Sequence, residues 1–159
     1  CSSLRDCDGG YCAGLVAFGD GMCSPPWMFG ERSAPQTLEV ADGGNARSDV
    51  LIYVQASVPV DLVLTLDLFH DVDTQDLTVE LLIPGPSDGT DEERPRITVW
   101  PADGLSTSHP TGGRVSIPVR AFGDETINGR WTVVVSDTTA DGASGGLFGW
   151  ELAYSSRFD

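Results

Sequence analysis

The sequence predicts an all-β protein: an eight-stranded, jelly-roll-like β-sandwich preceded by a short disulfide-linked segment. Two observations predict this class. After Thr37, apolar and polar residues alternate with a period of two, which is the period of half-buried strands. No segment shows an apolar stripe at helical spacing with capping residues, which argues against parallel α/β folds. The length of 159 residues fits one ordinary domain with a small additional piece.

Eight short strands are expected, separated by Gly, Pro, Asp and Ser. In chain order they are TLEVAD (37–42), DVLIYVQA (49–56), VDLVLTLDLFHD (60–71), DLTVELLIP (76–84), RITVWP (96–101), GRVSIPVRAF (113–122), GRWTVVVSD (129–137) and LFGWELAYSS (147–156). One face of the third strand is expected to lie wholly in the core, since it carries Leu62, Leu64, Leu66 and Leu68. Trp131 and Trp150 are expected to anchor that core, and Asn128–Gly129 predicts a hairpin turn.

All four cysteines lie in the first 24 residues, a segment too short and too rich in Gly and Asp to bury a core of its own. Two disulfides are therefore expected among Cys1, Cys7, Cys12 and Cys23, each contributing about 2–4 kcal/mol. The favoured pairing is Cys1 with Cys12 and Cys7 with Cys23, and the other two pairings stay open. Disulfides indicate an oxidising location, so the chain is expected to be secreted or at the cell surface.

Two alternatives apply to these cysteines. Zinc is disfavoured because the spacing contains no CxxC pair and no histidine lies nearby. Cys1 is followed by small residues, as in bacterial lipoproteins, so a lipid anchor at Cys1 is the alternative to a disulfide there.

Three parts are expected along the chain: a cysteine-rich segment at residues 1–24, a linker at 25–36 and the β-sandwich at 37–159. The linker is inferred from PPWMFGERSAP (25–35), where three prolines argue against a regular strand. Its Trp27, Met28 and Phe29 are expected to pack on the neighbouring domain. An exposed binding patch is the alternative.

The formal net charge is −15, from 24 acidic and 9 basic residues. Such a charge repels phosphates and anionic headgroups, which argues against nucleic-acid and membrane-surface roles. No apolar run approaches the ~20 residues of a transmembrane helix. A hard divalent cation suits the charge better, and HDVDTQD (70–76) offers Asp71, Asp73 and Asp76 as calcium ligands. Asp137 and Asp141 are the second choice, and an ordinary solvated turn is the alternative.

The segment DGASGG (141–146) is similar to the GDSGG signature around the nucleophile of trypsin-like serine proteases, which makes Ser144 a candidate nucleophile. A catalytic serine needs a histidine base that is held by an aspartate. Neither His70 nor His109 lies in a matching motif, and only fifteen residues follow Ser144. A turn is therefore the favoured interpretation of this segment, and a small serine hydrolase is the least favoured function.

Two stretches, LDLFHDVDTQDLTVELLIPGPSDGT (66–90) and FGDETINGRWTVVVSDTTADGASGGLFGWELAY (122–154), resemble the P domain. This β-sandwich follows the catalytic domain in kexin- and furin-like proprotein convertases. The shared positions are His70, Asp76, Leu77, Leu81, Pro84, Gly89 and Thr90 in the first stretch, then Phe122, Asp124, Glu125, Asn128, Gly129, Trp131, Val133, Val135, Asp137, Gly146, Leu147, Trp150 and Leu152. The resemblance covers about 120 residues and leaves out the cysteine-rich segment.

The resemblance implies a non-catalytic module that stabilises or targets a subtilisin-like protease, with a protease domain or a surface protein as its partner. Calcium binding is common among bacterial relatives of this type. The family's Arg-Gly-Asp triplet is replaced by Thr74, Gln75 and Asp76, so integrin-type recognition is not implied. The alternative function is a carbohydrate- or surface-binding β-sandwich, for which Trp100 in VWPADG is the candidate exposed aromatic residue.

Overall fold

The computed structural model describes residues 11–13, 22–24, 27–54, 58–85, 90–102, 104–119 and 126–157, with side chains from Phe29 onward. Its strands are β1 (Tyr11–Ala13), β2 (Met22–Ser24), β3 (Trp27–Ala34), β4 (Leu38–Val40), β5 (Asn45–Ile52), β6 (Val58–His70), β7 (Leu77–Leu82), β8 (Arg96–Trp100), β9 (Gly112–Pro118), β10 (Gly129–Asp137) and β11 (Gly145–Arg157). A 3-10 turn, η2 (Thr74–Asp76), lies between β6 and β7. Within these ranges no helix is long and apolar enough to cross a membrane.

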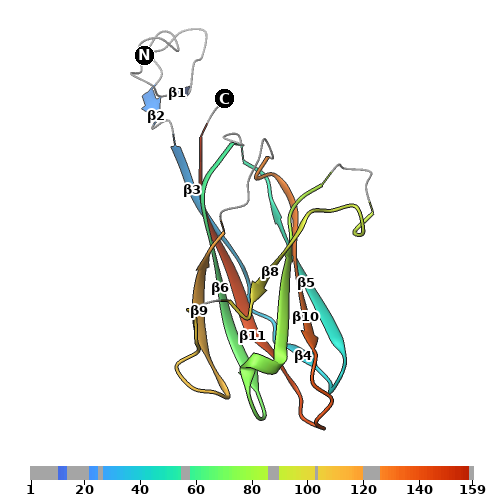
Figure 1. Ribbon diagram of the computed structural model, residues 1–159. Coiled ribbons are helices and arrows are strands. Elements are labelled where there is room, and N and C mark those ends of the chain that lie inside the picture. The colour runs from blue at the N-terminus through green and yellow to red at the C-terminus, as the bar shows by residue number, and fades with distance from the viewer. Residues whose placement is uncertain are drawn as a thin grey trace.

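Two antiparallel sheets pack against each other as layers (Figure 1). One sheet has the strand order β5-β10-β7-β8, and the other has the order β3-β11-β6-β9, with β4 also paired to β11. From β5 onward the chain passes back and forth between the two sheets, and only β7 and β8 are consecutive neighbours. The predicted all-β sandwich is confirmed, with nine strands in its layers among the described residues instead of the eight expected.

The core lies between the layers and follows the predicted period of two. The predicted inner row of β6 is at most 2% exposed, and it consists of Leu62, Leu64, Leu66 and Leu68. Trp131 and Trp150 are also buried, as expected. The indole N–H of Trp131 donates to the Ile127 carbonyl oxygen at 2.9 Å, so the ring is buried together with a satisfied polar group.

The expectation that residues 25–35 contain no strand is wrong. Residues 27–34 form β3, which pairs antiparallel with β11 over eight positions, from Trp27 opposite Arg157 to Ala34 opposite Trp150. The prolines do not prevent this strand because Pro25, Pro26 and Pro35 all lie outside it. β3 is also an edge strand, so one side of its backbone needs no partner.

The expected hairpin at Asn128–Gly129 is also absent from the described structure. β9 pairs with β6 in one sheet, whereas β10 pairs with β5 and β7 in the other, so this connection crosses between layers. The Asn128 side chain instead extends the β5–β10 ladder: its Oδ1 accepts from the Val54 N–H at 2.6 Å and its Nδ2 donates to the Val54 carbonyl at 2.9 Å.

The two disulfides predicted for Cys1, Cys7, Cys12 and Cys23 involve side chains outside the described residues. The backbones of β1 and β2 are described, and they pair with Cys12 opposite Cys23. The favoured pairing and the lipid anchor at Cys1 stay predictions.

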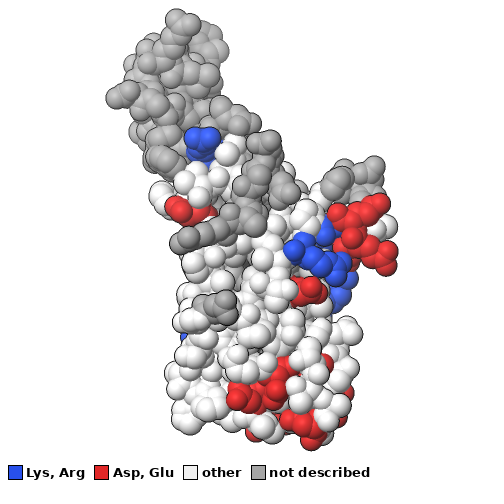
Figure 2. Space-filling model, viewed as in Figure 1, with Lys and Arg blue, Asp and Glu red and all other residues white. Residues whose placement is uncertain are grey.

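Four of the nine arginines gather on the outer face of the β5-β10-β7-β8 sheet, on one side of the molecule (Figure 2). We call Arg47, Arg94, Arg96 and Arg130 the arginine cluster. Asp91 binds three of them, with N–O distances of 2.6 Å to Arg47, 2.6 Å to Arg130 and 3.0 Å to Arg94, and Arg96 lies 3.8 Å from Glu80. Each guanidinium therefore has a carboxylate partner, which gives the cluster a role in holding the fold.

Arg94 is the buried member of the arginine cluster, at 5% exposure. Its guanidinium donates to the backbone carbonyls of Leu82, Ile83 and Arg130, to the Thr132 hydroxyl and to the Asp91 carboxylate. These contacts fasten the segment before β8 onto β7 and β10. Hydrogen bonds from Arg47, and next from Arg94, lower the pKa of Asp91 to about 2.

Candidate functional site

Acidic side chains gather at one end of the sandwich (Figure 2). Asp71, Asp73 and Asp76 lie between β6 and β7, Asp137 is the last residue of β10, and Asp141 lies between β10 and β11. The three carboxylates of the first loop have separate partners. Asp71 Oδ2 accepts from Ser144, Asp73 Oδ1 accepts from the Gln75 N–H at 2.9 Å, and Asp76 Oδ1 accepts from Thr139 Oγ1 at 2.9 Å. Asp73 thereby caps η2.

The second choice of ligands is similarly divided. Asp137 Oδ1 accepts from the Thr139 N–H at 3.0 Å, and Asp141 Oδ1 accepts from the Ala143 N–H at 2.9 Å. Across the described part of the chain, no three His, Cys, Asp or Glu side chains are placed to hold a metal ion. As arranged, the predicted carboxylates do not form a common set of ligands, and calcium binding stays a prediction from the sequence.

His70 is buried, at 3% exposure, and its contacts are with the loop that follows β6 and with Asp137. Its Nδ1 accepts from the backbone N–H groups of Val72 at 3.2 Å and Asp73 at 3.0 Å, so Nδ1 carries no proton. Its Nε2 therefore carries the proton, and it faces Asp137 Oδ2 at 3.6 Å, with both side chains fully buried. The histidine closes the end of β6 onto the loop that follows it.

Ser144 pairs with the Asp71 carboxylate and not with a histidine. Its Oγ donates to Asp71 Oδ2 at 3.0 Å, its N–H donates to the same oxygen at 3.1 Å, and the Asp71 N–H donates to the Ser144 carbonyl at 2.9 Å. These bonds, the backbone N–H first, hold the pKa of Asp71 below its ordinary value. Neither ring nitrogen of His70 faces the hydroxyl, so the described residues contain no Ser144–His70 pair, and Ser144 lies in the connection from β10 to β11.

The expectation of an exposed Trp100 is wrong. The side chain is 0% exposed, and its indole N–H donates to the Thr74 carbonyl oxygen at 2.8 Å. Trp100 lies at the end of β8 and fills the core, so its ring offers no face to a ligand.

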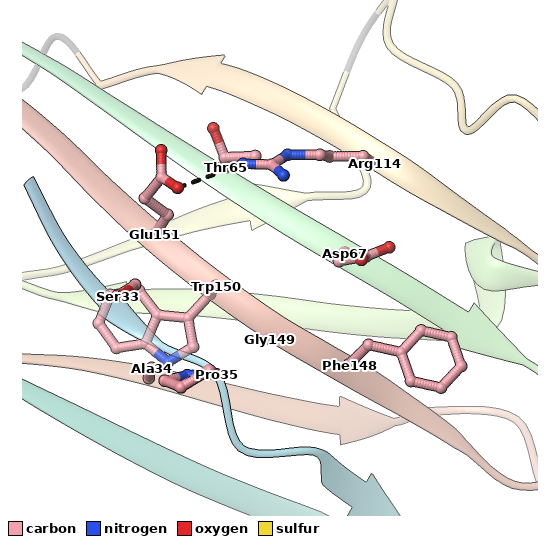
Figure 3. A pocket seen from close by; sticks show the side chains of 10 residues that line it. All are labelled: Ser33, Ala34, Pro35, Thr65, Asp67, Arg114, Phe148, Gly149, Trp150 and Glu151. Atoms are coloured by element: carbon pink, nitrogen blue, oxygen red, sulfur yellow. Dashed lines mark hydrogen bonds and ion pairs between the residues drawn. The ribbon is translucent and has the colours of Figure 1, made fainter.

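The described surface contains a groove that the sequence did not single out. It has a volume of about 250 Å³ and lies on the outer face of the β3-β11-β6-β9 sheet (Figure 3). Its floor is made by cross-strand neighbours: Gly149 of β11 lies opposite Asp67 of β6, which lies opposite Arg114 of β9. Because Gly149 has no side chain, the sheet is hollowed at this point.

An exposed aromatic residue borders this groove. A β-bulge between Leu147 and Gly149 interrupts the β11–β6 register, and Phe148 lies at the bulge with 55% of its surface exposed. Its ring stacks on Phe69 of β6, with centroids 4.5 Å apart and planes 25° apart. This support holds the exposed ring in place.

Polar side chains line the rest of the groove. Arg114 NH2 binds Glu151 Oε2 at 3.2 Å, reaching from β9 across β6 to β11. Figure 3 shows Asp67 between Arg114 and Phe148. Thr65 Oγ1 and Ser116 Oγ are 3.1 Å apart on the same face. The groove thus combines one apolar ring with two carboxylates, hydroxyls and a guanidinium.

The groove was missed because its residues come from four strands that are distant in sequence. One signal was available: β6 carries Asp61, Thr65 and Asp67 on the face opposite its leucines, and this predicts a polar outer face. The position of Phe148 depends on a bulge, which the alternation pattern does not reveal.

Comparison with known proteins identifies solved structures with a similar fold. No protein-family model and no curated protein matches the sequence. The serine protease of Aeromonas sobria, solved in complex with a chaperone, is similar to this chain with a TM-score of 0.59 and 18% identity, over 85% of this chain and 28% of that one. A second structure, of the serine protease of Aeromonas sobria, gives a TM-score of 0.57 and 18% identity, over 90% of this chain and 29% of that one.

This chain therefore spans less than a third of the protease chain that it matches. At this level of identity the likeness concerns the fold, which is a β-sandwich like one part of a serine protease.

Proposed function

We propose that this chain is a non-catalytic accessory module of a secreted or surface-bound serine protease of the subtilisin-like class, in the manner of a P domain. The observation that carries the proposal is the likeness to the A. sobria serine protease, which takes in 85% of this chain and 28% of the protease. Because the sandwich corresponds to less than a third of the protease chain, the likeness favours a module that accompanies a separate catalytic domain. The P-domain motifs at 66–90 and 122–154 independently favour the same kind of module.

The hydrogen bonds at the acidic end also support a non-catalytic role. A serine nucleophile passes its proton to a base, whereas Ser144 Oγ donates to Asp71, whose lowered pKa makes it a weak base. His70 has one nitrogen occupied by two backbone N–H groups and the other directed at Asp137. The partner is proposed to be a protease domain or another surface protein, and the cysteine-rich segment at 1–24 suits an extracellular location.

The test of the non-catalytic role is reaction of the purified chain with a fluorophosphonate probe, which labels activated serines, followed by intact-mass measurement. We expect no adduct after an incubation that fully labels trypsin. An adduct that disappears in Ser144→Ala and persists in Ser136→Ala, a variant of the serine next to the last residue of β10, would contradict the proposal.

A further inference from the structure

The outer face of the β3-β11-β6-β9 sheet carries a second hollow next to the groove of Figure 3. This hollow, of about 300 Å³, is lined by Phe29 of β3, Asp61 and Val63 of β6, and Ala153 and Ser155 of β11. Both hollows are built on the same pair of strands, β6 and β11. The six residue steps from Gly149 to Ser155 extend roughly 20 Å at the rise of a strand. We call the two hollows together the sheet-face groove.

The sheet-face groove has the same chemistry at both ends. Phe29 is 79% exposed at one end, and Phe148 is 55% exposed at the other. An aspartate accompanies each ring, Asp61 beside Phe29 and Asp67 beside Phe148. The Asp67 carboxylate has no hydrogen bond or ion pair to any other described residue, so its oxygens are free to accept from a ligand.

The two hollows of the sheet-face groove have different floors. Gly149, Glu151 and Arg114 line the hollow beside Phe148, where the Arg114–Glu151 pair supplies donors and acceptors, whereas Val63 and Ala153 line the hollow beside Phe29. Phe29 and Phe148 lie on the same sheet face, each in a hollow that an aspartate also lines. Two such hollows spaced along β6 and β11 suit an elongated ligand.

We propose that the sheet-face groove binds a linear, neutral oligosaccharide segment of a polysaccharide. Sugar rings have apolar C–H faces that pack on aromatic rings, and their hydroxyl groups donate to carboxylates and accept from a guanidinium. Phe29 and Phe148 provide the rings, Asp61 and Asp67 the acceptors, and the Arg114–Glu151 pair both kinds of group. Sites of this type combine apolar surface with a few placed polar groups.

The backbone arrangement disfavours an extended peptide in this place. A peptide that adds to a sheet needs a strand edge with unpaired N–H and C=O groups. β6 and β11 are each paired on both sides, β6 with β11 and β9, and β11 with β6, β3 and β4. An anionic polysaccharide is disfavoured by the net charge of −15 and by the two aspartates. The proposal does not depend on a protease partner.

The test is affinity electrophoresis of the chain in native gels that contain soluble neutral polysaccharides: mixed-linkage β-glucan, hydroxyethylcellulose, xylan, galactomannan and pullulan. We expect retardation by at least one of them. Both Phe29→Ala and Phe148→Ala should weaken that binding at least tenfold, and Asp67→Asn should weaken it severalfold. Because both phenylalanines are exposed, these variants should melt within a few degrees of the wild type.

The matched control is Tyr53→Ala, which removes an aromatic side chain that is 72% exposed and lies outside the sheet-face groove. Its binding should equal that of the wild type. The proposal is overturned if none of the five polysaccharides retards the chain, or if the two phenylalanine variants bind as tightly as Tyr53→Ala. Retardation by the anionic polysaccharide alginate alone would also overturn the proposal. Retardation by oligoarginine alone would overturn it as well and would indicate a basic peptide as the ligand.

Discussion

Gly146→Ala is expected to lower the free energy of unfolding by more than about 3 kcal/mol, as the sum of backbone strain and a steric clash. Gly146 has φ +150°, and a Cβ there would fall on the Leu38 carbonyl oxygen of β4. Relief is blocked because Gly146 lies opposite Glu39 in β4 and Phe69 in β6. Urea unfolding followed by tryptophan fluorescence measures the change.

Gly43→Ala is the matched control for that experiment. Gly43 also has a positive φ, of +66°, but a Cβ there meets nothing within 4 Å. It should therefore show the strain alone, about 1–2 kcal/mol. If Gly146→Ala lowered the free energy of unfolding no more than Gly43→Ala does, the close packing of β4 on β11 would be contradicted.

Arg94→Ala is expected to lower the free energy of unfolding by about 2–4 kcal/mol, because it leaves buried acceptor atoms without their donor. The loss has two parts, because three backbone carbonyls lose a donor and Asp91 loses one of its three guanidinium partners. Arg94→Lys should recover only a fraction of the lost stability, since an ammonium group cannot reproduce the forked arrangement of donors of a guanidinium. Urea unfolding at pH 7 gives the free energy of unfolding of the wild type, Arg94→Ala and Arg94→Lys.

Arg130→Ala is the control within the arginine cluster, because the Arg130 side chain is 44% exposed and its ion pairs are worth less than about 1 kcal/mol. The pH dependence separates the two parts of the Arg94 effect. The folded pKa of Asp91 is lowered to about 2, so its contribution is present above the unfolded value of about 3.9 and is lost as the pH falls through about 2. The deficit of Arg94→Ala should therefore shrink between pH 4 and pH 2 without vanishing. A deficit no larger than that of Arg130→Ala would contradict the role given to Arg94.

The β-sandwich could be predicted because its strongest strand pattern is local. The leucine row of β6 and the buried Trp131 follow from the period of two, and burial on one face is its direct consequence. β3 could not be predicted in this way, because its residues 27–34 form a strand only through pairing with β11, more than a hundred residues later. Which strand an edge strand pairs with depends on the topology of the whole sheet, and this pairing produces no periodic pattern in the local sequence.

The candidate sites depended even more on distant contacts. Trp100 lies near the end of the predicted strand 96–101, directly before a proline, and was expected to be exposed, yet its N–H partner is the carbonyl of Thr74, 26 residues away. The partner of Ser144 is Asp71, at a separation of 73 residues. Motif spacing raised the question of a catalytic serine correctly, but only the three-dimensional structure identifies the group that its hydroxyl faces.

The most direct test of the proposed function is the thermal half-life of the subtilisin-like protease domain proposed as the partner of this chain, measured with the sandwich present and absent. An accessory module is expected to lengthen that half-life severalfold, since anything that binds only the folded state stabilises it. Gly146→Ala, with its sandwich destabilised, should lose the effect, and Tyr53→Ala should keep it. A half-life that is the same with and without the sandwich would contradict the proposed function.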